Sequence, residues 1–299
     1  MADLLHNYLG EALALLCAVT WAFAVILFRR SGEAVHPIGL NMFKNLLAIV
    51  LILPTIWIAG AGPQSEVPKF EYLMLLASGA LGIGVSDTLF FMSLNALGAG
   101  LLAIVDCLYS PFIILLSMAW LGESLAWPQW IGAALIVSAV LTALVERHGD
   151  KADRRRVMLG IIWGVLAMAA NAVGIVMIKP LLDRSPVLWV TEWRLFGGTA
   201  MLLVLLPLYR TRGAILASIM SRHRWAHMIG GAFLGGYLSM MIWLAGMKFT
   251  QASIASALNQ TTSIFIFILA ALMLHEKMTT NRVIGIILGV IGAFLVTYY

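Results

Sequence analysis

Long apolar stretches, each followed by a short connection that carries Gly, Pro or charged residues, run through the whole chain. Each stretch is close to the ~20 residues with which a helix crosses a ~30 Å hydrocarbon layer. The stretches are continuously apolar and do not alternate, which disfavours transmembrane strands. We therefore predict an all-α integral membrane protein with ten transmembrane helices, at residues 9–28, 37–59, 70–92, 97–121, 129–146, 157–178, 187–209, 225–247, 252–274 and 282–299.

An internal repeat follows from a constant shift of 153 positions across three spans. The matched pairs are Gly82 with Gly235, Ser86 with Ser239, Ser110 with Ser263, Glu123 with Glu276, and Gly132 with Gly285. We expect two five-helix units, 1–147 and 157–299, joined by a basic linker at 148–156. Because five is odd, the second unit must cross the membrane inverted relative to the first. Inverted repeats are a recurrent transporter architecture, with the substrate site near the midplane between the copies.

Composition agrees with a membrane protein and excludes several other classes. Hydrophobic residues make up 62% of the chain and charged residues only 11%, against roughly 25% charged residues in soluble domains. The net charge is +5, but Lys and Arg collect in the connections, where they anchor spans and do not form a nucleic-acid surface.

Cys17 and Cys107 lie in apolar stretches, which favours buried thiols over a disulfide. Residues 1–10 lack the basic region of a signal peptide, so we expect the first stretch to remain as a span.

A family resemblance rests on two matching segments. Trp120-Leu-Gly-Glu-Ser followed by Gln129-Trp-Ile-Gly recurs as Leu274-His-Glu-Lys followed by Arg282-Val-Ile-Gly. This pattern resembles the EamA-type ten-helix members of the drug/metabolite transporter superfamily, and bacterial amino-acid exporters of the aromatic-exporter type most of all. The chain departs from the usual pattern at Lys44 and Asn45, where an Arg is common.

The resemblance implies a multi-pass protein of the bacterial inner membrane. It also implies a central cavity between helices 1, 3, 4, 6, 8 and 9 that opens alternately to each side. Other members of the superfamily carry drugs, nucleotide sugars or phosphorylated sugars, and these cargoes remain the alternative.

Several charged residues fall inside predicted spans, where an uncompensated charge costs about 2.5–3.5 kcal/mol on insertion scales. These residues are Lys44, Asp87, Asp106, Glu192 and Arg194. Each is a candidate for the transport pathway, and Asp87 or Glu192 could carry a coupling proton. The alternative is an internal ion pair that only locks helices together, for example Asp87 with Lys44.

Polar and aromatic residues suggest a substrate-binding cavity. In the ninth span, Ser253, Ser256, Gln260 and Ser263 form one stripe at helical spacing, flanked by Asn259. Such groups either bind the ammonium and carboxylate of a zwitterion or form hydrogen bonds between helices. Trp21, Trp163 and Trp243 lie deep in their spans and, with Tyr109, form either an apolar box for a side chain or ordinary core packing.

Two symmetric features favour structural roles. Glu123 and Glu276, just past the ends of the fourth and ninth spans, are expected to cap or anchor neighbouring helix ends. Small residues four apart, Gly82 with Ser86 and Gly235 with Ser239, are expected to allow close helix packing.

Motifs for other chemistries are missing from the sequence. A phosphate-binding Gly-Lys-Ser/Thr loop does not occur, so we expect no ATP hydrolysis, and His, Cys, Asp and Glu show no metal-ligand spacing. We expect no cofactor and no enzymatic activity. An intramembrane enzyme and a channel are the alternatives from other functional classes. The sequence predicts a secondary transporter that exports amino acids or similar small metabolites, for which a monomer suffices.

The membrane orientation has two conflicting indications. One set of connections carries thirteen Lys and Arg residues and the other carries four, which places the first set in the cytoplasm and both termini outside. The family resemblance implies cytoplasmic termini. We prefer the orientation that the charge distribution indicates, with both termini outside. The thirteen residues are Arg29, Arg30, Arg147, Lys151, Arg154, Arg155, Arg156, Arg210, Arg212, Arg222, Arg224, Lys277 and Arg282.

Overall fold

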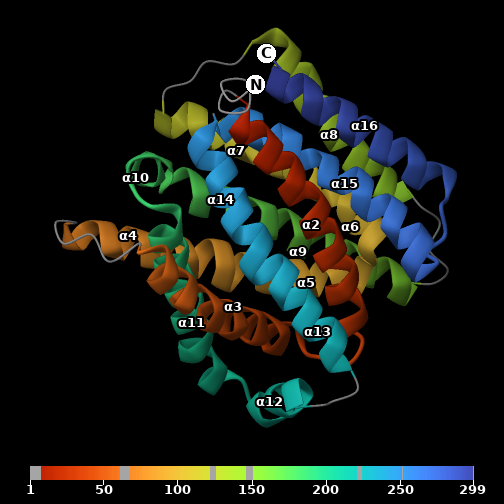
Figure 1. Ribbon diagram of the computed structural model, residues 1–299. Coiled ribbons are helices and arrows are strands. Elements are labelled where there is room, and N and C mark those ends of the chain that lie inside the picture. Colours follow the sequence, from red (N-terminus) through yellow and green to blue (C-terminus); the bar gives the residue numbers. More distant parts are fainter. Residues whose placement is uncertain are drawn as a thin grey trace.

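A computed structural model describes residues 8–60, 68–121, 126–145, 151–220, 224–250 and 252–298. The chain forms a bundle of helices, and no strand occurs within these ranges (Figure 1). The α-helices are α2 (Leu9–Ser31), α3 (Pro37–Ala59), α4 (Lys69–Gly79), α5 (Ser86–Leu97), α6 (Ala99–Asp106), α7 (Tyr109–Leu121), α8 (Trp127–Val145), α9 (Lys151–Val176), α10 (Lys179–Arg184), α11 (Val187–Leu205), α12 (Arg212–Met220), α13 (Trp225–Gly231), α14 (Met240–Phe249), α15 (Ala252–Leu274) and α16 (Thr280–Tyr298). Two π-helical segments, η1 (Ala80–Val85) and η4 (Ala232–Ser239), and one 3₁₀ turn, η2 (Leu206–Leu208), join them.

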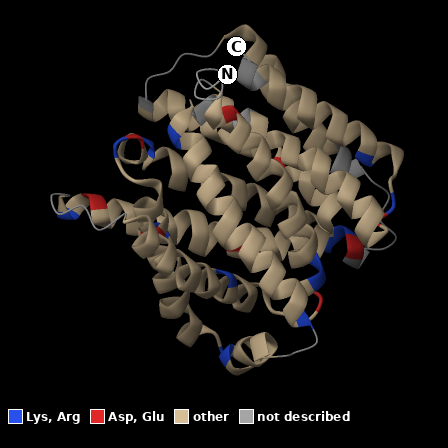
Figure 2. Cartoon of the chain, in the orientation of Figure 1, with Lys and Arg blue, Asp and Glu red and all other residues tan. Residues whose placement is uncertain are grey.

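The predicted all-α membrane fold is confirmed. Seven helical segments in the described part of the chain are long and apolar enough to cross a membrane, and three shorter apolar segments lie at Trp127–Leu141, Leu258–Leu274 and Thr280–Leu295. The number of ten spans stays a prediction. Figure 2 shows charged residues mainly at helix ends and in connections, while the helix bodies are almost free of them.

The helices differ from the predicted spans at particular places. The fourth span is broken between α6 and α7, because Pro111 lacks the N–H that a continuous helix needs in the first turn of α7. Helix α9 begins at Lys151, inside the segment expected to be a linker, and Asp153 lies in its first turn, where a negative charge stabilises a helix N-terminus. The short helix α12 was not expected.

Small residues bring the third span close to its neighbours, as predicted. Ser86 Oγ donates to the carbonyl of Ala167 at 2.9 Å, and Ser93 Oγ donates to that of Gly160 at 2.7 Å. A Cβ at Gly79 would collide with the backbone of Arg194. The backbones of α4 and α11 therefore touch, which fixes the position of Arg194 relative to η1.

Glu276 has the capping role that was predicted for it. Its Oε1 accepts a hydrogen bond from the Ala99 amide at 2.8 Å, and its Oε2 accepts one from the Gly100 amide at 2.9 Å. Gly98 adopts φ +80°, and a Cβ there would lie 2.8 Å from Oε1. The carboxylate thus ties the end of α15 to the start of α6. Glu123, its counterpart in the sequence, lies outside the described residues.

Candidate substrate cavity

A cavity lies between helices that come from both halves of the chain. Its volume is about 100 Å³, and roughly 10–15 Å³ is enough for one ordered water. The lining residues belong to the six spans expected from the family resemblance and, in addition, to α11. They are Cys17, Trp21, Gly82, Ile83, Ser86, Asp87, Phe90, Asp106, Tyr109, Met168, Asn171, Arg194, Gly235, Ser239, Met240, Trp243 and Asn259.

Both π-helical segments border this cavity. Gly82 and Ile83 belong to η1, and Gly235 and Ser239 belong to η4. A shift of 153 positions moves η1 onto residues 233–238, inside η4. π-Helical turns occur frequently at functional sites, because the wider turn changes which side chains face inward.

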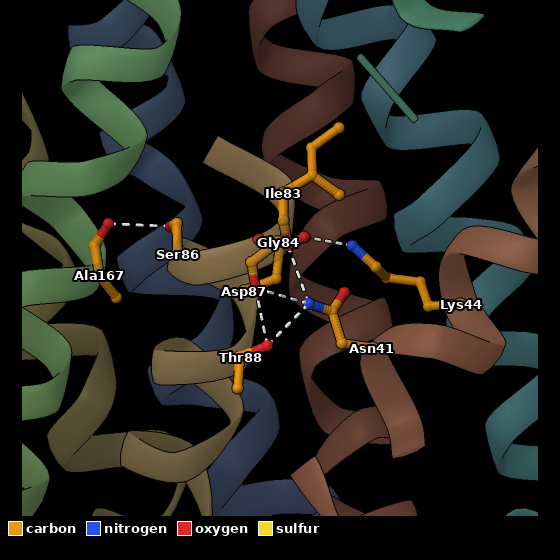
Figure 3. A network of polar contacts seen from close by, with 8 residues as sticks. All are labelled: Asn41, Lys44, Ile83, Gly84, Ser86, Asp87, Thr88 and Ala167. Atoms are coloured by element: carbon orange, nitrogen blue, oxygen red, sulfur yellow. Dashed lines mark hydrogen bonds and ion pairs between the residues drawn. The ribbon is translucent and has the colours of Figure 1, made fainter. Parts of the chain in front are cut away.

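Asn41 compensates for the wider turn of η1. Its Nδ2 donates to the carbonyls of Ile83 at 2.8 Å and Gly84 at 3.2 Å, and lies 3.0 Å from Thr88 Oγ1. Figure 3 shows Asn41 and Lys44 approaching this segment from the same side. A side chain from α3 therefore binds two backbone carbonyls of the π-helical segment, and Thr88 Oγ1 also donates to that of Gly84.

Lys44 and Asp87 form the internal ion pair that the sequence left open as an alternative to a role in the transport pathway. Lys44 Nζ donates to Asp87 Oδ2, and the two form an ion pair (Figure 3). The Lys44 side chain is only 1% exposed, whereas Asp87 is 14% exposed and lines the cavity. The cavity is therefore in contact with the carboxylate of the pair and separated from the ammonium group.

Two further charges face the cavity without an ion-pair partner in the described part of the chain. Arg194 on α11 is 3% exposed, and its Nε has no hydrogen-bond partner among the described residues. Asp106 lies at the break between α6 and α7 and makes no salt bridge to any described residue. Unpaired ionic groups are rare in a protein interior, so this arrangement fits a site that receives a ligand with both charges.

Aromatic rings form the apolar part of the wall. Trp21 packs against Phe90 with ring centroids 5.7 Å apart, and Tyr109 packs against Trp243 at 6.1 Å. The Tyr109 hydroxyl is buried and has no hydrogen-bond partner among the described residues. The cavity thus combines flat apolar surfaces with a small number of polar groups, as ligand sites commonly do.

Six of the ten predicted site residues line this cavity: Trp21, Asp87, Tyr109, Arg194, Trp243 and Asn259. Lys44 lies behind Asp87. Trp163, Gln260 and Ser263 are not among the lining residues; Gln260 is 2% exposed and Ser263 is fully buried beside Cys107. The side chains of Ser253 and Ser256 lie outside the described residues. Glu192 does not line the cavity, and the substrate-binding role of all these residues stays a prediction.

Asn171, Met168 and Cys17 are lining residues that sequence reasoning missed. Asn171 is a single amide in an apolar stretch of α9, without polar neighbours at helical spacing. A polar residue in the middle of a span was the available signal, because such residues usually face the bundle interior.

A cavity with buried charges in the middle of an apolar helical bundle defines the protein as a membrane transporter in class. The sequence profile of the EamA-like transporter family matches residues 8–145 and again residues 158–298. The chain belongs to this family of the drug/metabolite transporter superfamily.

Individual relatives are distant. An uncharacterized transporter of Archaeoglobus fulgidus is 25% identical over 283 residues, which cover 95% of this chain and 96% of that protein. A probable terminal-alkyne amino-acid exporter of Streptantibioticus cattleyicolor is 25% identical over 291 residues, covering 94% and 91%. A solved crystal structure with 15% identity superposes with a TM-score of 0.69 over 98% of this chain and 97% of that one, which shows a common fold.

Proposed function

We propose that this chain is a secondary transporter of the bacterial inner membrane that exports amino acids, or small polar metabolites of similar shape, by alternating access. The observation that carries this proposal is the placement of Arg194 and Asp106 in one cavity, each without an ion-pair partner among the described residues. A zwitterion satisfies both groups: its carboxylate faces Arg194 and its ammonium group faces Asp106. The rings of Trp21 and Trp243 then contact its side chain.

The packing of the helices supports two inverted five-helix units, 1–147 and 157–299, on either side of the cavity. Packing is reciprocal between the units: α5 packs on α9 as α14 packs on α2, and η1 packs on α11 as η4 packs on α3. The first helix of each unit also runs in the opposite direction. Arg156, near the start of α9, donates to the Asn95 carbonyl at 2.8 Å, and Gly32, just past the end of α2, lies against the Asn95 side chain.

A nucleotide sugar fits the cavity less well than an amino acid. Its diphosphate requires several cations, but Lys44 is already paired with Asp87. Of the charged residues that line the cavity in the described part of the chain, two are carboxylates and one is the cation Arg194. This balance favours a ligand without net charge.

Counterflow into proteoliposomes tests the proposal. Vesicles loaded with an unlabelled L-amino acid are placed in the same labelled amino acid, one amino acid at a time. At least one member of the panel accumulates above the level of protein-free vesicles if the proposal holds; failure of the whole panel overturns the choice of amino acids as cargo. Repeating the active case with and without a pH gradient determines whether export is coupled to protons.

A further inference from the structure

Gly82 lies at the point where the Arg194 guanidinium reaches the cavity. A Cβ on Gly82 would be 2.9 Å from Nη2 of Arg194 and 3.6 Å from Oδ1 of Asn171. Ordinary van der Waals contact begins near 3.4 Å. The guanidinium therefore occupies space that any larger residue at position 82 would take.

The guanidinium remains available because no carboxylate in the described part of the chain forms an ion pair with it. Asp87 acts on Arg194 through its charge, but its direct partner is the buried Lys44. A guanidinium presents N–H groups in a planar fork that matches the two oxygens of a carboxylate. Free donors, a buried position and access from the cavity together define a carboxylate-binding subsite.

We propose that Gly82 determines the specificity of this transporter for a free carboxylate, by leaving the Arg194 fork open to the substrate. This inference rests on the proposed function, because it assigns one end of the amino-acid substrate to one end of the cavity. It also separates the cargo from amines and amides of the same shape, which lack the anionic group.

The substitution Gly82→Ala isolates this effect. The atom that an added methyl group meets first is the far end of a flexible side chain, so the fold is retained while the guanidinium moves. Gly230→Ala is the matched control, because Gly230 lies in α13 outside the cavity lining and its Cβ would meet only Leu27 Cδ1, at 3.2 Å, among the described residues. Arg194→Lys is a second variant that keeps the charge and loses the fork.

Binding is measured on the purified protein through quenching of tryptophan fluorescence, since Trp21 and Trp243 line the cavity. The probes are L-leucine against L-leucinamide, and 4-methylpentanoate against 4-methylpentanamide. Because hydrogen bonds between two charged groups are among the stronger ones, the wild type should bind each acid at least about tenfold more tightly than its amide. In Gly82→Ala and Arg194→Lys this ratio should fall to about threefold or less, while Gly230→Ala keeps the wild-type ratio.

Three outcomes overturn the inference: equal binding of acid and amide by the wild type, an unchanged ratio in Gly82→Ala, or an equal weakening of both probes in that variant. Failure of the proposed function looks different. In that case the wild type prefers the carboxylates in the binding assay, but no amino acid shows counterflow.

Discussion

The buried Lys44 ammonium group is paired with Asp87, and only Asp87 reaches the cavity. The Lys44 ammonium group is therefore shielded from the cavity by its partner. The pair also leaves Arg194 without a direct protein carboxylate among the described residues. Lys44 thus contributes to the site without contacting the space that a substrate would occupy.

Replacing one member of this pair should destabilise the protein strongly. Asp87→Asn leaves the buried Lys44 ammonium group without its counter-ion, and breaking a buried pair in this way costs about 3–5 kcal/mol. The double variant Lys44→Met/Asp87→Asn should recover most of that loss. Thermal unfolding in detergent measures both. Arg224→Met is the control: it leaves Glu33, which is 48% exposed, so the loss of this pair should cost less than about 1 kcal/mol. Equal losses in Asp87→Asn and Arg224→Met would contradict the buried pair.

The two cysteines provide a probe of the cavity. Cys17 lines it, whereas Cys107 is fully buried outside its lining. Both thiols are buried, and burial slows their reaction with N-ethylmaleimide. Because Cys17 alone of the two lines the cavity, we expect slow modification of Cys17 in preference to Cys107, with a matching loss of transport, and we expect Cys17→Ser to abolish both effects. Cys107→Ser should remain sensitive. Mass spectrometry of the labelled protein checks the site, and modification of Cys107 in place of Cys17 would show that the cavity lies elsewhere.

Two tryptophans distinguish the cavity wall from the rest of the bundle. Trp243 packs on Tyr109 and lines the cavity, whereas Trp163 is not a lining residue. Trp243→Ala should raise the half-saturating concentration for transport about tenfold, equivalent to about 1.4 kcal/mol of lost aromatic contact. Trp163→Ala should change it by less than about threefold. Initial transport rates in proteoliposomes give both half-saturating concentrations. A larger effect of Trp163→Ala than of Trp243→Ala would place the substrate at another face of α9.

Removing the helix cap should affect folding stability without affecting specificity. Glu276→Ala exposes the amides of Ala99 and Gly100, and the loss of a helix N-cap typically costs about 0.5–2 kcal/mol. The expected result is a lower melting temperature with an unchanged preference between acid and amide probes. Glu33→Ala, which removes an exposed pair with Arg224, serves as the control with a smaller shift. A changed preference would show that Glu276 acts on the cavity.

Much of the fold followed from the sequence because apolar length and spacing report directly on membrane helices. The pairing of Lys44 with Asp87 was the alternative that the sequence left open, since two opposite charges in neighbouring spans have few other ways to be compensated. The break before Pro111 was not predicted, although the missing N–H of this proline was a visible signal for it.

The choice of inward-facing residues was less predictable. A polar stripe fixes one face of a helix, but the rotation of that helix depends on its neighbours. In α15 the cavity meets Asn259, whereas the adjacent Gln260 is buried against protein. The π-helical turns in η1 and η4 change the facing of side chains in a way that regular helical spacing does not indicate. Asn171 had no periodic companion that would mark its face.

In the proposed mechanism Arg194 and Asp106 act together on one zwitterionic substrate. Counterflow of the best-transported amino acid, compared between the wild type, Arg194→Gln and Asp106→Asn, tests this most directly. We expect strong accumulation in the wild type and at least about tenfold less in each variant, with both variants folded. Undiminished counterflow in either variant would contradict the proposed mechanism.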